Sequence, residues 1–210
     1  VPDKYSAYFH RAHVKCELGD TDGALKDFST AIEIEPDNEL AYGLRATFKS
    51  EMGDYEGAMP DYDEALRIDP SSEMLYLARA MAHKELGNWE RALSDFSNVI
   101  RLQPKDAVAW FQRAYVKYDL GDLKGTLKDL NTGLRYNKGD ATVYNARAEV
   151  RFKLGDLKGA VEDSTTAIKM DPTDPQFFRL RAVAFTMLRR YKEALKDYDK
   201  MLELNPEYAE

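Results

Sequence analysis

The feature that most constrains the fold is a repeat period of 34 residues. Alanine recurs at this step without exception, at Ala12, Ala46, Ala80, Ala114, Ala148 and Ala182. Glycine keeps the step at Gly19, Gly53, Gly87, Gly121 and Gly155, and proline at Pro36, Pro70, Pro104, Pro172 and Pro206, with Lys138 at the missing place. A fixed period of roughly 20 to 50 residues is typical of repeat architectures. We therefore divide the chain into a lead (1–4), six units (5–38, 39–72, 73–106, 107–140, 141–174 and 175–208) and a tail (209–210).

Each unit is predicted to contain two helices joined by a tight turn. In the third unit, Ser72 can cap a first helix, Gly87 supplies a left-handed exit, and Asn88 can cap a second helix that stops before Pro104. The same kind of residue precedes the other first helices (Asn38, Asp106, Asp140, Asp174) and the other second helices (Asp20, Asp54, Asp122, Asp156). The sequence thus predicts an all-α chain of six antiparallel helix pairs within one solenoid.

The aromatic and small residues of a unit resemble the tetratricopeptide repeat. In the second unit the series is Tyr42, Ala46, Gly53, Tyr55, Ala58, Tyr62, Ala65 and Pro70, and registered copies cover nearly the whole chain. The resemblance implies a right-handed superhelical solenoid whose first helices line a concave, peptide-binding groove. It also implies a non-catalytic interaction scaffold or adaptor that binds a peptide or helical segment of another protein.

The groove positions of that family place an uneven surface in this chain. Apolar and aromatic residues dominate units two to four: Leu40, Leu44, Met74, Leu77, Met81, Val108, Phe111, Gln112, Tyr115 and Tyr118. An acidic rim is formed by Glu17, Glu51, Glu85 and Asp119. We expect the partner to offer an apolar, basic-flanked segment. The alternative is that part of the apolar set only packs between adjacent first helices, and that the acidic residues are a solvated face.

A second regular pattern consists of opposite charges. Position seven of every unit is arginine (Arg11, Arg45, Arg79, Arg113, Arg147, Arg181), and position twenty-three is aspartate (Asp27, Asp61, Asp95, Asp129, Asp163, Asp197). Position eleven is basic in five units (Lys15, Lys49, His83, Lys117, Arg151) and is Phe185 in the sixth. We predict an Arg–Asp ladder, within or between units, in which each arginine is neutralised. Anion capture by a row of arginines is the alternative.

Composition excludes several classes of protein. The net charge is −7 and the isoelectric point about 5.2, without a cluster of basic residues, which argues against nucleic-acid binding. No apolar run is long enough for a membrane span. Cys16 is the only cysteine, so no internal disulfide can form, and we expect a cytoplasmic protein. The chain lacks an initiator methionine, and we expect it to come from a longer protein.

No combination of residues predicts catalysis or a cofactor. His10, His13 and Cys16 lie three apart beside Glu17, a spacing that could hold zinc. Because no second ligand pair accompanies them, we interpret them as ordinary groove residues and expect no metal. The Lys, Arg and Asn pattern with which chaperone adaptors of the family hold a terminal carboxylate is also missing, so capture of a chain terminus is not expected.

Two parts of the chain depart from the repeat. The fourth unit has Thr126, Leu130 and Gly133 at sites that are mostly alanine or aromatic, and Lys138-Gly139 at the proline junction, which predicts a softer joint to the fifth unit. The sixth unit lacks a polar cap, so its end is predicted to be partly uncovered. This leaves two further hypotheses: a structural module that self-associates through the uncapped C-terminal end, and a regulatory, co-chaperone-like arm of a larger protein.

Overall fold

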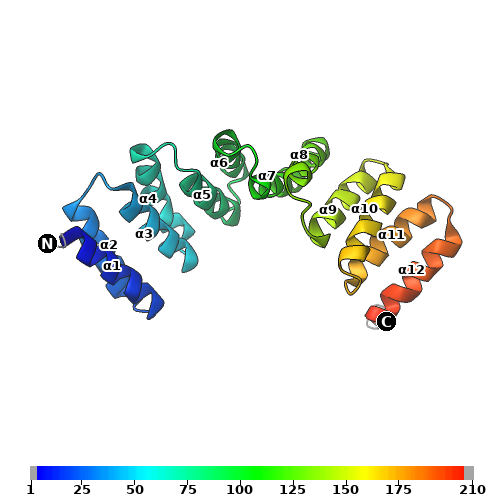
Figure 1. The fold of residues 1–210 in the computed structure, drawn as a ribbon, viewed down its shortest axis with the longest axis horizontal. Helices are drawn as coiled ribbons and strands as arrows, with labels where there is room; N and C mark the ends of the chain where they lie inside the picture. The colour runs from blue at the N-terminus through cyan, green and yellow to red at the C-terminus, as the bar shows by residue number, and fades with distance from the viewer. Residues whose placement is uncertain (1–3, 206–210) are drawn as a thin grey trace. The chain divides into compact units, whose positions relative to one another are not determined.

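The computed structural model describes residues 4–205, and within that range the chain forms twelve α-helices and no strand (Figure 1). The helices are α1 (Lys4–Glu17), α2 (Thr21–Ile34), α3 (Glu39–Glu51), α4 (Tyr55–Ile68), α5 (Glu73–Glu85), α6 (Trp89–Leu102), α7 (Ala107–Asp119), α8 (Leu123–Tyr136), α9 (Ala141–Lys153), α10 (Leu157–Met170), α11 (Pro175–Met187) and α12 (Tyr191–Leu204). Each odd-numbered helix packs most extensively on the even-numbered helix that follows it. The prediction of an all-α repeat fold of six helix pairs is therefore confirmed.

Small residues allow the two helices of a pair to approach closely. Ala12 of α1 and Ala24 of α2 are fully buried, and the equivalent alanines of the later repeats are buried in the same way. Aromatic side chains fill the space beside them. Phe28 packs against Phe9 of its own repeat and against Phe48 of the next, so the core is continuous from one repeat to its neighbour.

The predicted caps and turns explain why each helix begins and ends where it does. Asp20 accepts a hydrogen bond from the Gly23 amide at 3.0 Å, and nine of the ten predicted cap residues accept a backbone hydrogen bond. Asn88 occupies the cap position of α6 without a side-chain cap bond. The turn glycine has a positive φ in five repeats, and Arg189, with φ 59°, takes its place in the sixth. The period therefore fixes backbone conformation as well as residue type.

The chain divides into two compact units, residues 1–104 and 105–210. The first contains α1 to α6 and has core clusters around Phe28 and Tyr62. The second contains α7 to α12 and has clusters around Leu130 and Phe177. The division falls two residues before the predicted end of the third repeat, and each cavity described below lies within one unit.

Candidate functional site

The Arg–Asp ladder is present within every repeat. In each, the arginine of the first helix donates from Nε and Nη2 to both carboxylate oxygens of the aspartate on the second helix, at 2.5–2.9 Å. All six aspartates are buried. A buried carboxylate needs a paired cation, and a two-pronged guanidinium is the best match in geometry. The interpretation that these arginines are neutralised is confirmed, and anion capture by the row as a whole is not supported.

The ladder also joins neighbouring repeats, an alternative that the sequence left open. The remaining nitrogen of the guanidinium, Nη1, donates to the side chain at position twenty-five of the preceding repeat. The pairs are Arg45–Ser29 at 2.9 Å, Arg79–Asp63 at 2.6 Å, Arg147–Asn131 at 3.0 Å and Arg181–Thr165 at 3.1 Å. Each ladder arginine also lies over an aromatic ring three residues before it, with centroid distances of 4.9–6.0 Å.

A second cation supports the aspartate in four repeats. Lys15, Lys49, Lys117 and Arg151 contact the ladder aspartate at 2.7–3.0 Å. In the third repeat, position eleven is His83. Its side chain is buried and does not contact the ladder aspartate as the other basic residues do. Burial lowers the pKa of the His83 imidazole, which favours its neutral form.

An apolar cavity of about 270 Å³ lies between α3 and α5 in the first unit. Three of the predicted groove residues line it: Leu40, Leu44 and Met74. Leu40 is 51% exposed and Met74 75% exposed, so their side chains are accessible to a ligand. Leu77 and Met81 are half-buried on α5 and lie outside its lining. The first unit thus brings part of the predicted groove together as one concave apolar surface.

The predicted groove residues of the second unit have less uniform surroundings. Val108 is exposed, whereas Gln112, Tyr115 and Tyr118 are half-buried. Phe111 is 8% exposed and belongs to the core cluster, so its ring is a packing residue and not part of a ligand surface.

The Tyr118 hydroxyl is already engaged by two charged residues. It donates to Glu149 Oε1 at 2.5 Å and accepts from Lys153 Nζ. Burial, followed by the hydrogen bond to Glu149, raises the pKa of Tyr118. A ligand that used this tyrosine would have to displace or share those bonds.

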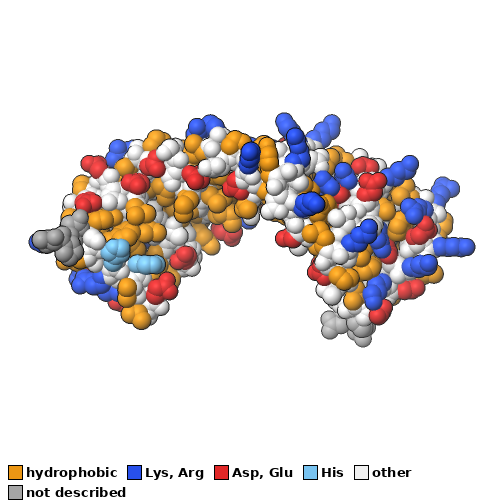
Figure 2. All heavy atoms as spheres, in the orientation of Figure 1, with side chains coloured by type: hydrophobic (Ala, Val, Ile, Leu, Met, Phe, Trp, Pro, Cys, Tyr) orange, Lys and Arg blue, Asp and Glu red, His pale blue; other side chains and the backbone are white. Residues whose placement is uncertain are grey.

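Charge separates the two units. Residues 1–104 contain 11 Lys and Arg against 20 Asp and Glu, a net charge of −9, and residues 105–210 contain 19 against 17, a net charge of +2. The four predicted rim residues Glu17, Glu51, Glu85 and Asp119 are all exposed. In Figure 2, hydrophobic side chains gather over the first unit and Lys and Arg side chains over the second. The acidic, apolar character of the first unit is therefore a property of its surface.

His10 and His13 are exposed and Cys16 is half-buried on α1. Among residues 4–205, no group of three or more His, Cys, Asp or Glu side chains is placed to hold a metal ion. Burial raises the pKa of the Cys16 thiol, which disfavours the thiolate that would bind metal. No described helix is both long and apolar enough to cross a bilayer.

Sequence profiles of the tetratricopeptide repeat match residues 5–38, 40–72, 77–131, 141–174 and 175–208. No curated protein sequence matches the chain significantly. Among solved structures, the fold is similar to YrrB, described as a TPR protein with an unusual peptide-binding site (21% identity, 85% of this chain and 92% of that chain, TM-score 0.77). It is also similar to MamA from Desulfovibrio magneticus RS-1 (20% identity, 80% and 96%, TM-score 0.75) and to a repeat protein from Parabacteroides merdae (20% identity, 95% and 79%, TM-score 0.77).

Proposed function

Because this chain belongs to the tetratricopeptide repeat family, we propose that it is a non-catalytic protein-interaction scaffold whose first unit docks an apolar segment of a partner. The cavity between α3 and α5 is the observation that carries the proposal. Leu40 and Met74 stand at its mouth with most of their surface in water, and covering such side chains is favourable by about 25 cal/mol per Å² of apolar area. Met74 can adapt to different apolar side chains, since its thioether chain is unbranched and flexible.

The charge of the first unit supports a basic-flanked partner segment. Its net charge of −9 attracts Lys and Arg side chains, and three of the rim residues, Glu17, Glu51 and Glu85, project from it into solvent. Such charges raise association rates and select partners, and their effect is screened by salt. The partner we propose thus combines an apolar anchor, which fills the cavity, with flanking cations, which face the rim. YrrB, a repeat protein of similar fold, has a peptide-binding site, which supports a peptide segment as the ligand here.

Quantitative affinity capture with paired variants tests the proposal. Met74→Asp and Leu40→Asp place a charge at the mouth of the cavity. Each should lower the recovery of the groove partner by at least about tenfold, since burying an unpaired carboxylate is costly. Leu18→Asp is the matched control, because Leu18 is also an exposed apolar residue of the first unit, at the turn after α1, and it does not line the cavity. Partner recovery should also fall with rising salt.

Two outcomes would contradict the groove proposal. An unchanged partner set in both cavity variants would remove the apolar anchor from the mechanism. Equal loss of partners in Leu18→Asp would show that any new charge on the first unit disturbs binding. Circular dichroism of each variant establishes that the helices are intact before capture is compared.

Self-association is a second candidate function, favoured by one observation on the last helix pair. Tyr191 and Leu195 of α12 are 63% and 62% exposed and lie one helical turn apart, and Met187 at the end of α11 is equally exposed. Exposed apolar side chains gathered on one helix face can pack on a second copy. Light scattering over a range of concentrations tests it. A strictly monomeric chain at high concentration excludes this candidate, whereas an oligomer that Leu195→Asp dissociates supports it.

A further inference from the structure

The third repeat departs from the others at two positions that face each other. In the first, second and fifth repeats, the cation at position eleven donates to the carbonyl oxygen of the glycine at position nineteen: Lys15 to Gly23, Lys49 to Gly57 and Arg151 to Gly159. In the third repeat, histidine replaces the cation and arginine replaces the glycine, as His83 and Arg91. In this repeat the cationic residue is therefore on α6, as Arg91, and not on α5. The imidazole of His83 occupies the position from which lysine or arginine contacts the ladder aspartate in four other repeats.

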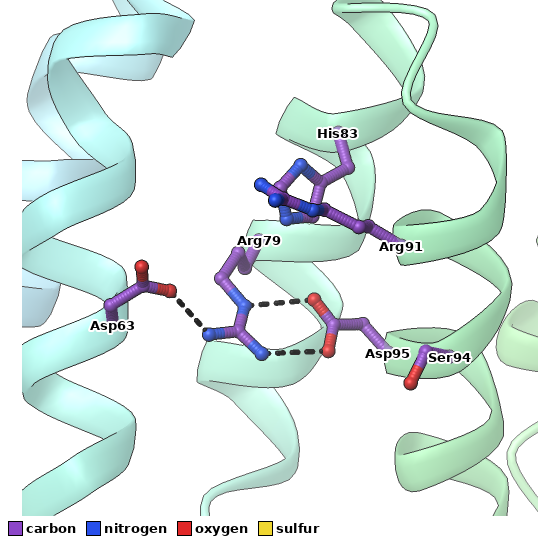
Figure 3. A pocket seen from close by; sticks show the side chains of 6 residues that line it. All are labelled: Asp63, Arg79, His83, Arg91, Ser94 and Asp95. Atoms are coloured by element: carbon purple, nitrogen blue, oxygen red, sulfur yellow. Dashed lines mark hydrogen bonds and ion pairs between the residues drawn. The ribbon is translucent and has the colours of Figure 1, made fainter.

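A cavity of about 290 Å³ lies beside His83 and Arg91 within the first unit (Figure 3). Its walls are Asp63 of α4, Arg79 and His83 of α5, and Arg91, Ser94 and Asp95 of α6. It shares no residue with the apolar cavity between α3 and α5. Arg91 and Ser94 are exposed, so the cavity is open to solvent on their side.

Two nitrogen-bearing side chains that lie against each other in this cavity, His83 and Arg91, lack partners among the described residues (Figure 3). His83 is only 4% exposed, and its Nδ1 is buried without a hydrogen bond. The bonds within the cavity join Arg79 to Asp63 and Asp95, and no bond joins the exposed Arg91 guanidinium to the other residues drawn in Figure 3. A buried polar atom that lacks a partner costs roughly 1–3 kcal/mol, so an acceptor that reached His83 would be stabilised. A guanidinium and a protonated imidazole together are donors suited to an oxyanion.

The charges around the cavity determine whether a proton must bind together with an anion. Arg79 binds both oxygens of Asp95 and one oxygen of Asp63, so these carboxylates are partly neutralised. Counting Asp63 and Asp95 against Arg79 and Arg91, the site is balanced while His83 is neutral. An added anion leaves one negative charge in excess, and a protonated His83 removes that excess. His83 is the one titratable lining residue that is not already charged at neutral pH.

We propose that this cavity binds a small oxyanion, a carboxylate or a phosphate-like group, between Arg91 and His83, and that His83 takes up a proton as the anion enters. The site lies outside the groove and is independent of the proposed function. Repeats with a lysine or arginine at position eleven cannot form it, because that cation already fills the space beside the ladder aspartate. Protonation is coupled to binding, so affinity should rise by up to about tenfold for each unit by which pH falls.

Side-chain imidazole NMR of the full chain tests the proposal directly. The chain has three histidines, and exposed His10 and His13 act as internal controls. Sulfate and acetate are titrated separately in the millimolar range at constant ionic strength, since both keep their charge between about pH 6 and 8. We expect a saturable shift of the His83 signals and a rise in the pKa of His83, with neither at His10 or His13. Saturation by sulfate alone identifies a phosphate-like group as the ligand, and saturation by acetate a carboxylate.

Two variants on the same helix locate the site. Arg91→Ala should abolish saturation, whereas Arg101→Ala, which removes an exposed arginine of α6 outside the cavity, should leave it intact. Because an anion that binds only the folded chain stabilises it, the melting temperature of the parent chain should rise with anion concentration. His83→Lys, which restores the residue type of the other repeats, should abolish that rise. No saturation by either anion, equal shifts at all three histidines, or saturation that survives in Arg91→Ala would each overturn the proposal.

Discussion

At the scale of single residues, Gly133 shows why a residue that is poor for a helix can be required in one. Glycine inside a helix costs about 1 kcal/mol relative to alanine. A Cβ atom at position 133 would lie 2.7 Å from Cδ1 of Phe111 and closer still to Cε1. Phe111 is buried in the core cluster and cannot swing aside. The missing side chain at 133 therefore makes room for the aromatic ring.

We predict that Gly133→Ala lowers the free energy of unfolding by about 1–3 kcal/mol, because overpacking against Phe111 outweighs the gain in helix propensity. The matched control is Gly43→Ala, where the new Cβ meets only the tip of the flexible Leu75 side chain, Cδ2 at 2.6 Å. Gly43→Ala should be close to neutral or stabilising. Urea denaturation measures both, and a Gly133→Ala chain as stable as the parent would refute the packing explanation.

The turn of the sixth repeat contains a residue in an unfavourable backbone conformation. Arg189 has φ 59°, where the other five turns have glycine. A left-handed conformation costs a residue with a Cβ about 1–2 kcal/mol. Glycine avoids this strain, but it loses more conformational entropy on folding, which offsets part of the gain. Arg189→Gly should therefore stabilise the protein by about 0.5–1 kcal/mol, seen as a higher melting temperature. Arg190→Gly should act in the opposite direction, since Arg190 binds Glu193 and lies over Phe185.

At the scale of helices, the Arg–Asp ladder fixes how each first helix packs on its second helix. Removing one partner of a buried pair costs more than the pair itself contributes, because a charge is left without compensation. Asp163 is buried and is bound by Arg147 and Arg151. Each pair thus fixes the register of two helices while contributing little net stability.

Asp163→Asn should accordingly destabilise the chain by about 3–5 kcal/mol, since it leaves two guanidinium groups without an anion. The control is Glu64→Gln, which breaks the exposed Arg67–Glu64 pair at 2.7 Å and should cost less than about 1 kcal/mol. Chemical denaturation of both variants gives the comparison. Similar losses in the two would show that burial does not set the value of these pairs.

The joint between α8 and α9 differs from the joint between α4 and α5. Gly139 has φ 68° and replaces the proline junction, whereas Pro70 restricts the earlier joint. We predict that amide hydrogens of residues 137–141 exchange at least about fivefold faster than those of residues 69–73, which corresponds to roughly 1 kcal/mol of local stability. Hydrogen exchange followed by mass spectrometry measures these rates. Equal rates at the two joints would contradict the prediction of a softer joint between α8 and α9.

At the scale of the whole molecule, the buried carboxylate of Asp27 makes stability depend on pH. The Arg11 guanidinium holds the pKa of Asp27 at about 2, below its ordinary value of 3.8. A lowered folded pKa contributes stability above the unfolded value, and this contribution is lost as pH falls from 3.8 towards 2. Denaturation over that range should show the loss. Arg11→Met should move it to higher pH, and an unchanged profile in that variant would contradict the assignment.

The fold was largely predictable from the sequence, because the caps, turns and buried alanines each recur with the same period. The candidate site was predictable only in part. Leu40, Leu44 and Met74 lie together as expected, but the burial of Phe111 depends on a gap that Gly133 provides across a helix pair. The paired departures His83 and Arg91 are visible in the sequence. That these two positions contact each other is known only from the structure, in which the backbone carbonyl at position nineteen accepts a hydrogen bond from the side chain at position eleven.

The bond from each ladder arginine back to the preceding repeat has a consequence for how such chains can be lengthened or shuffled. Arg45 binds Ser29, Arg79 binds Asp63 and Arg181 binds Thr165, so these repeats each offer the next one an oxygen acceptor at position twenty-five. A duplicated or grafted repeat is therefore compatible with its new neighbour only if that oxygen is kept. An engineer building longer arrays from these repeats should treat position twenty-five as part of the connector, even though it lies in the middle of a helix.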